Sequence, residues 1–196
     1  MIRLLPARIL GAGLLLVLML VGLVTYESRA RNAGQEVVLA MEAVDPRNLL
    51  TGHYVSLRLT QALLPGQACP PRTQPYSEGG WLALRADGAQ HRFVGAGPTR
   101  EAAKAKGGDV LIRGGVYCSR VAVGEAGESR EAVTLDIGVD RFHAGQDQAQ
   151  AMEQVLRGRR DPGAAPAFAV VSVGHDGRAR LKGVILDGKR TDLDWW

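Results

Sequence analysis

Apolar and polar positions alternate along much of the chain after residue 35, which is the spacing of half-buried β-strands. Residues 36–44 read EVVLAMEAV and place Val37, Leu39 and Met41 on one side. The same period of two along residues 53–60 puts Leu57 and Leu59 on one face, together with the residues at 53 and 55. We therefore predict two strands here, joined by a turn.

Asp-Gly pairs mark turns between further alternating runs. One pair, at 87–88, divides residues 81–94, and another, at 176–177, divides residues 167–186, so each run is predicted to be a β-hairpin. A third pair, at 187–188, predicts a turn before the end. Residues 110–123 and 132–139 also have the pattern of strands, and the glycines at 114 and 115 favour a bulge.

Two segments do not alternate. Residues 65–80 contain four prolines and three glycines, which predicts a long loop. Residues 146–156 space Ala149, Met152 and Val155 along one side, which predicts a short amphipathic helix. With about eight strands, the fold class is mainly β: an antiparallel β domain, built as a curved sheet or a partly closed barrel, with this one short helix.

The chain begins with an apolar segment. Residues 9–24 are all apolar or glycine, a length between that of a signal-peptide core and that of a spanning helix. Ser28-Arg29-Ala30 resembles a cleavage site, but it lies beyond the apolar run and Arg31 follows it. We therefore expect an uncleaved N-terminal transmembrane helix: residues 1–30 form the anchor, with a short cytoplasmic N-terminus, and residues 31–196 form an extracytoplasmic β-rich domain.

The overall charge adds little to this picture. A length of 196 residues suits one domain with an appendage, and the net charge of +4 is spread thinly, with RGRR at 157–160 as its densest patch. We interpret that patch as solvated surface and expect no nucleic-acid partner. Basic residues beside a membrane segment usually serve topology or attraction to anionic head groups.

Cys69 and Cys118 are the two cysteines of the chain. In an oxidising compartment an even pair favours a disulfide, which is our prediction. The alternatives are two separate buried thiols or a redox site, although a redox pair usually has Cys-x-x-Cys spacing.

The segment between the first two strands is rich in turn-forming residues. Pro46 has a fixed φ and no N–H, Asp45 can bond a backbone amide two residues on, and Gly52 permits conformations that other residues avoid. For Asp45 and Arg47 two readings stay open, a turn with an ion pair or a partner-binding edge. Tyr54 is expected to pack its ring while its hydroxyl reaches a partner.

This run, VDPRNLLTGHYVSLRL at 44–59, resembles the signature of the GDYxxLxY family of bacterial membrane-anchored proteins. Gly52, Tyr54 and Leu57 match the pattern, whereas His53 stands where the family has Asp and Leu59 where it has the final Tyr. Both departures lie on the face of Leu57, so we interpret that face as core. The similarity extends to an IGVDRF segment at 137–142 and to the closing hairpin.

The resemblance implies a partner rather than a reaction. The family has no agreed activity, and its genes often lie beside those of polytopic membrane proteins. We therefore expect a single-pass accessory or interaction protein of the bacterial inner membrane, bound to a polytopic membrane protein, with its domain in the periplasm. Its oligomeric state stays open. The alternative is an envelope module that binds a sugar or lipid in a cleft near the 65–80 loop.

The sequence contains no familiar catalytic constellation. It has no GxSxG elbow, Walker loop or dinucleotide fingerprint, and its four histidines show no metal-ligand spacing, so we predict no catalytic residue, cofactor or metal. A signal-peptidase-like hydrolase, with Ser56 activated by Lys182 or Lys189, is a weaker alternative because Ser56 falls in mid-strand. Trp195 and Trp196 could lie at the bilayer interface or cap the core.

Overall fold

The structure is a computed structural model, and it describes residues 5–44, 54–63, 67–70, 79–123, 128–143 and 167–193. Several predictions fall outside these residues: the turn of Asp45, Pro46 and Arg47, Gly52 and His53, the helix at 146–156, RGRR at 157–160, and the two C-terminal tryptophans. Of the predicted 65–80 loop, residues 67–70 and 79–80 are described, and they belong to no helix or strand.

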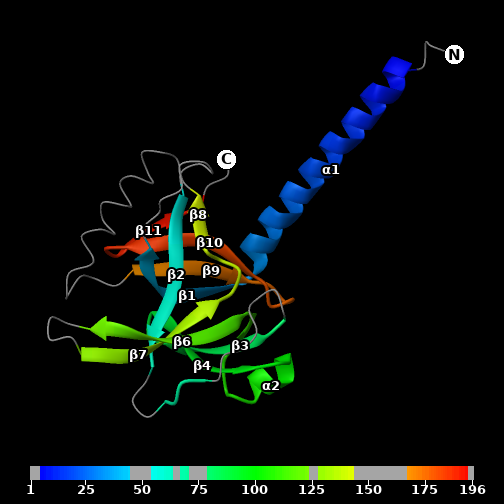
Figure 1. The fold of residues 1–196 in the computed structure, drawn as a ribbon. Coiled ribbons are helices and arrows are strands. Elements are labelled where there is room, and N and C mark those ends of the chain that lie inside the picture. The colour runs from blue at the N-terminus through cyan, green and yellow to red at the C-terminus, as the bar shows by residue number, and fades with distance from the viewer. Residues whose placement is uncertain are drawn as a thin grey trace.

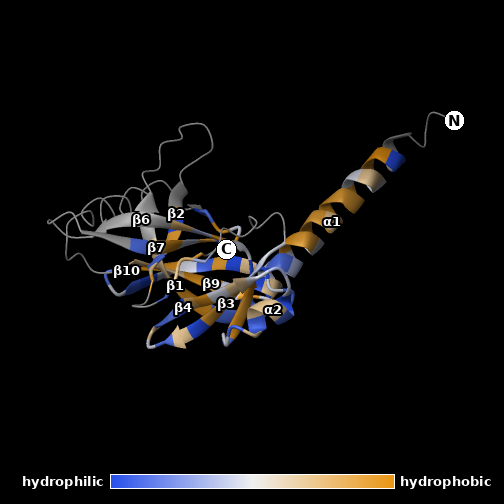
Figure 2. Ribbon diagram, turned by 60° about the horizontal axis from the view of Figure 1, so that its bottom comes forward, coloured by the Kyte–Doolittle hydropathy of each residue, from blue (hydrophilic) through white to orange (hydrophobic). Residues whose placement is uncertain are grey.

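Helix α1 (Leu5–Ala33) extends away from a β-rich domain, as Figure 1 shows. Its 29 residues give a length of about 43 Å at 1.5 Å per residue. Its large apolar side chains from Ile9 to Val24 are between 43% and 74% exposed, and most of the helix is coloured as hydrophobic in Figure 2. The segment Arg8–Ala33 is long and apolar enough to span a membrane, and none of its most apolar 18-residue window is buried within the protein.

The larger sheet is antiparallel and has the order β11-β10-β9-β1-β2-β7-β6, with β8 also paired to β2. Its strands are β1 (Gln35–Val44), β2 (Tyr54–Ala62), β6 (Gly115–Val123), β7 (Glu128–Asp136), β8 (Arg141–His143), β9 (Ala167–Val173), β10 (Ala179–Leu186) and β11 (Lys189–Asp192).

The two central strands change partners along their length. Residues 35–41 of β1 pair with β9, and residues 42–44 pair with β2. In β2, residues 54–56 pair with β8 and residues 59–62 pair with β7. A continuous strand that serves two neighbours in succession bends the sheet, and the mainly β, antiparallel fold class predicted from the sequence is confirmed.

The smaller sheet has the order β4-β3-β5. It contains β3 (Trp81–Asp87), β4 (Gln90–Gly97) and β5 (Val110–Arg113), and α2 (Arg100–Lys104) lies between β4 and β5 in the sequence. Helix α2 was not predicted from the sequence. Its one local signal is Thr99, whose side chain accepts a hydrogen bond from the Ala102 N–H at 3.2 Å and caps the first turn.

The predicted hairpins are present. β3 pairs with β4, β9 with β10 and β10 with β11, each antiparallel. The turn glycines Gly88, Gly177 and Gly188 have φ of 60°, 78° and 73°, a region that residues with a β-carbon seldom enter. The Asp-Gly signals therefore located these turns correctly.

The segment at 110–123 differs from its prediction as one strand with a bulge. It forms two strands in different sheets, because β5 pairs with β3 whereas β6 pairs with β7. Gly114 lies between them, and a β-carbon there would come within 2.5 Å of the Asp136 carbonyl oxygen. The glycine allows the chain to pass closely over β7 as it moves from one sheet to the other.

The hydrophobic core contains apolar side chains from both sheets. The alternation in β1 and β2 is as predicted, since Val37, Leu39, Leu57 and Leu59 are all at most 5% exposed. The small sheet contributes Leu82, Leu84 and Ile112, each fully buried.

A buried glutamine ties the two sheets together. Gln61 of β2 is 7% exposed, its Oε1 accepts from the Phe93 N–H at 2.9 Å, and its Nε2 donates to the His91 carbonyl at 2.9 Å. The Nδ1 of His91 accepts from the Val38 N–H of β1 at 3.3 Å. Side chains thus satisfy backbone groups of both β4 and β1 where the two sheets meet.

Candidate functional site

The described part of the signature segment lies beside the IGVDRF segment. Tyr54 pairs with His143 and Ser56 with Arg141, and the Leu57 N–H donates to the Asp140 carbonyl at 2.8 Å. The signature segment and the IGVDRF segment are therefore neighbours in the large sheet. Leu57 packs in the core, whereas Asp45, Pro46, Arg47, Gly52 and His53 lie outside the described residues.

The structure joins Cys69 and Cys118 in a disulfide, with their Cα atoms 6.2 Å apart. This bond attaches segment 67–70 to β6. Gln67, in the same segment, donates from Nε2 to the Phe93 carbonyl at 3.5 Å, which attaches it to β4 as well.

The end of α1 is fixed to the large sheet. The Nε of Arg180, on β10, donates to Glu27 Oε1 at 2.6 Å, and this hydrogen bond raises the pKa of Arg180. At the joint between α1 and β1, a β-carbon on Gly34 would overlap Ser172 Oγ and lie 2.9 Å from the Val173 carbonyl oxygen. The helix can approach β9 this closely because residue 34 is glycine.

A pocket of about 530 Å³ lies beside this contact, and we call it the junction pocket. Its walls come from the end of α1, the residues between β7 and β8, and the start of β10. Its charged lining residues are Glu27, Arg31, Asp140, Arg141 and Arg180. The arrangement suits a polar ligand with negative charge, because arginines outnumber carboxylates among the described lining residues.

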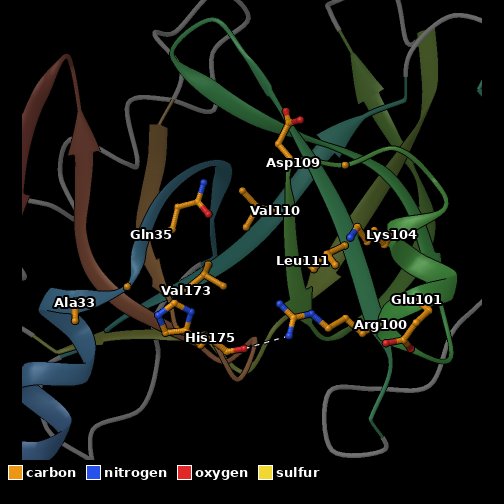
Figure 3. Close-up of a pocket in the computed structure, with 13 residues that line it drawn as sticks. Ala33, Gln35, Arg100, Glu101, Lys104, Asp109, Val110, Leu111, Val173 and His175 are labelled. Carbon is orange, nitrogen blue, oxygen red and sulfur yellow. Dashed lines mark hydrogen bonds between the residues drawn. The ribbon is translucent and has the colours of Figure 1, made fainter.

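A second pocket, of about 540 Å³, lies near α2, and we call it the α2 pocket (Figure 3). It is lined by the end of α1, by α2, by the start of β5 and by the turn after β9. Arg100 and Lys104 oppose Glu101 and Asp109 in charge, and Arg100 Nη1 donates to the His175 carbonyl at 3.4 Å. This pocket could hold a small ligand that carries both donors and acceptors.

Trp81 packs against the α2 region but does not form an open patch. The guanidinium carbons of Arg100 and Arg113 lie 5.5 and 5.3 Å from its ring centroid, within cation–π range. A β-carbon on Gly177 would overlap the ring, and the Arg113 N–H donates to the Gly177 carbonyl at 2.8 Å. Trp81 therefore holds the β9–β10 turn against the small sheet.

A group of charged side chains spans β1, β10 and β11. Glu36 accepts from Lys182 and from Arg190, whose Nη1 lies 3.0 Å from Glu36 Oε2. These hydrogen bonds, Arg190 first, lower the pKa of Glu36 to about 2. Arg190 also pairs with Asp192 at 2.7 Å.

The sheet order separates the residues of the hydrolase alternative. β9 and β1 lie between β10, which carries Lys182, and β2, which carries Ser56. Lys189 lies one strand farther, on β11. The ammonium of Lys182 also forms an ion pair with Glu36 of β1, which occupies it on a strand other than β2.

The histidines are likewise dispersed. His91 contacts β1, His143 is in β8 and His175 lines the α2 pocket. Burial lowers the pKa of His91, an effect that the charge of Asp109 partly opposes. Within the described ranges, no three His, Cys, Asp or Glu side chains are grouped so that they could hold a metal ion.

The fold defines a class of protein: a β domain preceded by a helix of membrane-spanning length and composition. The family model described as GDYXXLXY protein matches residues 16–184. The chain belongs to the GDYXXLXY family. Searches of curated proteins and of solved structures found no match.

Proposed function

We propose that the chain is a single-pass protein of the bacterial inner membrane that serves as an accessory to a polytopic membrane protein. The proposal rests on the exposure of α1. Its large apolar side chains from Ile9 to Val24 are exposed, and the described part of the β domain does not bury them. Such a surface needs lipid or other membrane helices around it. The arginines before the apolar run favour a cytoplasmic N-terminus and a periplasmic β domain.

The way α1 joins the domain supports a role in which orientation matters. Only Gly34 separates the end of α1 from the start of β1, and Arg180 holds Glu27 one to two turns before the helix ends. The one-residue joint and the contact between Arg180 and Glu27 together restrain the orientation of the β domain relative to α1. A partner within the membrane and a partner surface on the β domain could then be engaged together.

Purification from native membranes in mild detergent tests the accessory role. We expect the full chain to co-purify with a polytopic protein, and a photoreactive residue placed at Leu16 or Met19 to form a cross-link to it. The matched control is the same photoreactive residue at exposed Asp187, on the far hairpin. Recovery of a lone monomer in several detergents would contradict the proposal.

Protease treatment tests the topology separately. In intact cells the β domain should be protected, and after permeabilisation of the outer membrane it should be cleaved while the inner membrane stays sealed. Protection in sealed spheroplasts would place the domain in the cytoplasm and overturn this part of the proposal.

A second candidate function is an envelope ligand-binding module, which the α2 pocket favours. Its volume of about 540 Å³ falls within the range of small-molecule sites, and its lining mixes charges of both signs. None of the described lining residues of the α2 pocket belongs to the 65–80 loop. Arg100 lines this pocket and also lies over the ring of Trp81. Binding of envelope sugars that is lost in Lys104→Ala and kept in Lys106→Ala would favour this candidate, since Lys106 does not line the pocket.

A further inference from the structure

The junction pocket contains an arginine whose hydrogen-bonding capacity is only partly used. The side chain of Arg180 is 12% exposed, and its Nε donates to Glu27. Across the part of the chain that the structure describes, its two terminal nitrogens donate no hydrogen bond. These terminal nitrogens are not among the buried polar atoms that lack a partner, so solvent reaches them beside the pocket that Arg180 lines. An acceptor bound in the pocket can therefore reach these donors.

The charges around Arg180 indicate the sign of that acceptor. Arg31 and Arg141 also line the pocket, against the carboxylates of Glu27 and Asp140, so the described lining residues carry one positive charge in excess. Arg141 lies with its Nε 3.3 Å from Asp140 and is 49% exposed, which leaves it accessible. Guanidinium groups match the geometry of phosphate oxygens and lose their hydration more readily than ammonium groups.

The distance along α1 places the pocket relative to the bilayer. The apolar run ends at Val24, and at 1.5 Å per residue Glu27 and Arg31 lie about 4.5 and 10.5 Å beyond it. The head-group layer is about 5 to 7 Å thick on each side of the hydrocarbon core. If α1 spans the membrane, as the proposed function requires, these two lining residues bracket the level of the lipid phosphates.

We infer that the junction pocket binds the phosphate of an anionic phospholipid of the outer leaflet. The terminal nitrogens of Arg180 and the guanidinium of Arg141 donate to the phosphate oxygens, while Glu27 holds Arg180 through Nε. The excess positive charge favours an anionic lipid over a zwitterionic one. A bound head group would fix the β domain against the membrane at a second point beside α1.

The test uses the full chain, purified in mild detergent and stripped of lipid. Native mass spectrometry would measure retention of a short-chain phosphatidylglycerol, beside the diacylglycerol of the same chains, which lacks the phosphate. The variants are Arg180→Gln and Arg141→Gln, and the second keeps the test valid if the first fails to fold. Arg178→Gln is the matched control, because Arg178 is 60% exposed and does not line the pocket.

We expect the wild-type chain and the Arg178 variant to retain phosphatidylglycerol and not diacylglycerol. Loss of one charged donor should weaken retention by about tenfold in each pocket variant. Equal retention of the two lipids, or a folded Arg141 variant that binds like the wild type, would overturn the inference. So would inorganic phosphate that binds in the same pocket as tightly as the lipid, because the ligand would then be a soluble phosphate.

Carbonate extraction of membranes separates this inference from the proposed function on which it rests. A chain released by carbonate would not be membrane-anchored, whatever its lipid retention in detergent. A chain that stays in the membrane but shows no phosphate-dependent retention would leave the anchor intact and remove the lipid site alone.

Discussion

At the scale of single residues, the structure assigns the charged side chains to different tasks. Glu36 joins β1 to strands that lie beyond β9, and His91 accepts a backbone hydrogen bond at the contact between the two sheets. Both have shifted pKa values, so each links the stability of the domain to pH.

The ion pairs of Glu36 predict a loss of stability in acid. Because the folded pKa of Glu36 is about 2 and its ordinary value is 4.5, its contribution is complete above pH 4.5 and declines as the pH falls toward 2. Glu36→Gln should lower the free energy of unfolding by about 1 kcal/mol at pH 7, since the site is partly exposed and screened. It should also flatten this acid-dependent decline. Thermal unfolding at several pH values measures both, with exposed Glu131→Gln as control.

His91 predicts a second pH dependence, at milder acidity. Burial lowers its pKa from 6.5, so the unfolded chain takes up the proton first, and stability declines as the pH falls below about 6.5. Protonation of Nδ1 would also remove the acceptor of the Val38 N–H. His91→Asn supplies an oxygen acceptor that does not titrate, and we expect it to remove the decline between pH 6.5 and 5. If the decline were unchanged in His91→Asn but absent in His175→Asn, the prediction for His91 would be wrong.

At the scale of elements, the joint between α1 and β1 depends on a missing side chain. Gly34→Ala would bring a β-carbon against Ser172 Oγ and the Val173 carbonyl. Because the backbone cannot yield easily, we expect destabilisation of about 1 to 3 kcal/mol in chemical unfolding. Gly22→Ala is the control, since no atom lies within 4 Å of a β-carbon there. Adding Ser172→Ala should restore part of the loss, and complete restoration would show that the Val173 carbonyl offers no obstacle.

The contact between the sheets depends on Gln61. Gln61→Met keeps the approximate shape but leaves the Phe93 N–H and the His91 carbonyl without their side-chain partner. We expect a loss of about 2 to 3 kcal/mol in the free energy of unfolding, because both groups are at least partly buried. The control is Gln90→Met, at the start of β4 beside the hairpin turn. Equal effects of the two substitutions would show that the hydrogen bonds of Gln61 are not what stabilises the contact.

These elements show which parts of the fold the sequence determines locally. The strands and hairpins followed from alternation and from Asp-Gly pairs, which act within a few residues. The division of residues 110–123 between two sheets did not, because it depends on pairing of β5 with β3 and of β6 with β7. The sequence predicted no role for Gln61, because its partners lie about thirty residues away on β4.

At the scale of the whole molecule, the pockets arise where distant segments meet. The junction pocket is built from residues 27–31, 138–141 and 179–181, and no spacing in the sequence connects them. The pair Cys69 and Cys118 was apparent because the chain offers two cysteines and hence one pairing. The signature residues indicated the family, but the lining of the pockets needed the tertiary structure.

The contact between Glu27 and Arg180 predicts that helix and domain are energetically coupled. A double-mutant cycle with Glu27→Gln, Arg180→Gln and the double variant isolates their interaction in the full chain, measured by thermal unfolding in detergent. We expect a coupling of about 1 to 2 kcal/mol, since a charge-assisted hydrogen bond at 2.6 Å joins a largely buried arginine to a half-exposed carboxylate. The control cycle pairs Glu27→Gln with Arg178→Gln, which makes its contact with Asp176 instead, and should give no coupling. Additive effects of Glu27 and Arg180 would mean that this pair does not couple α1 to the β domain, and the orientation of the domain would then be restrained by the short joint at Gly34 alone.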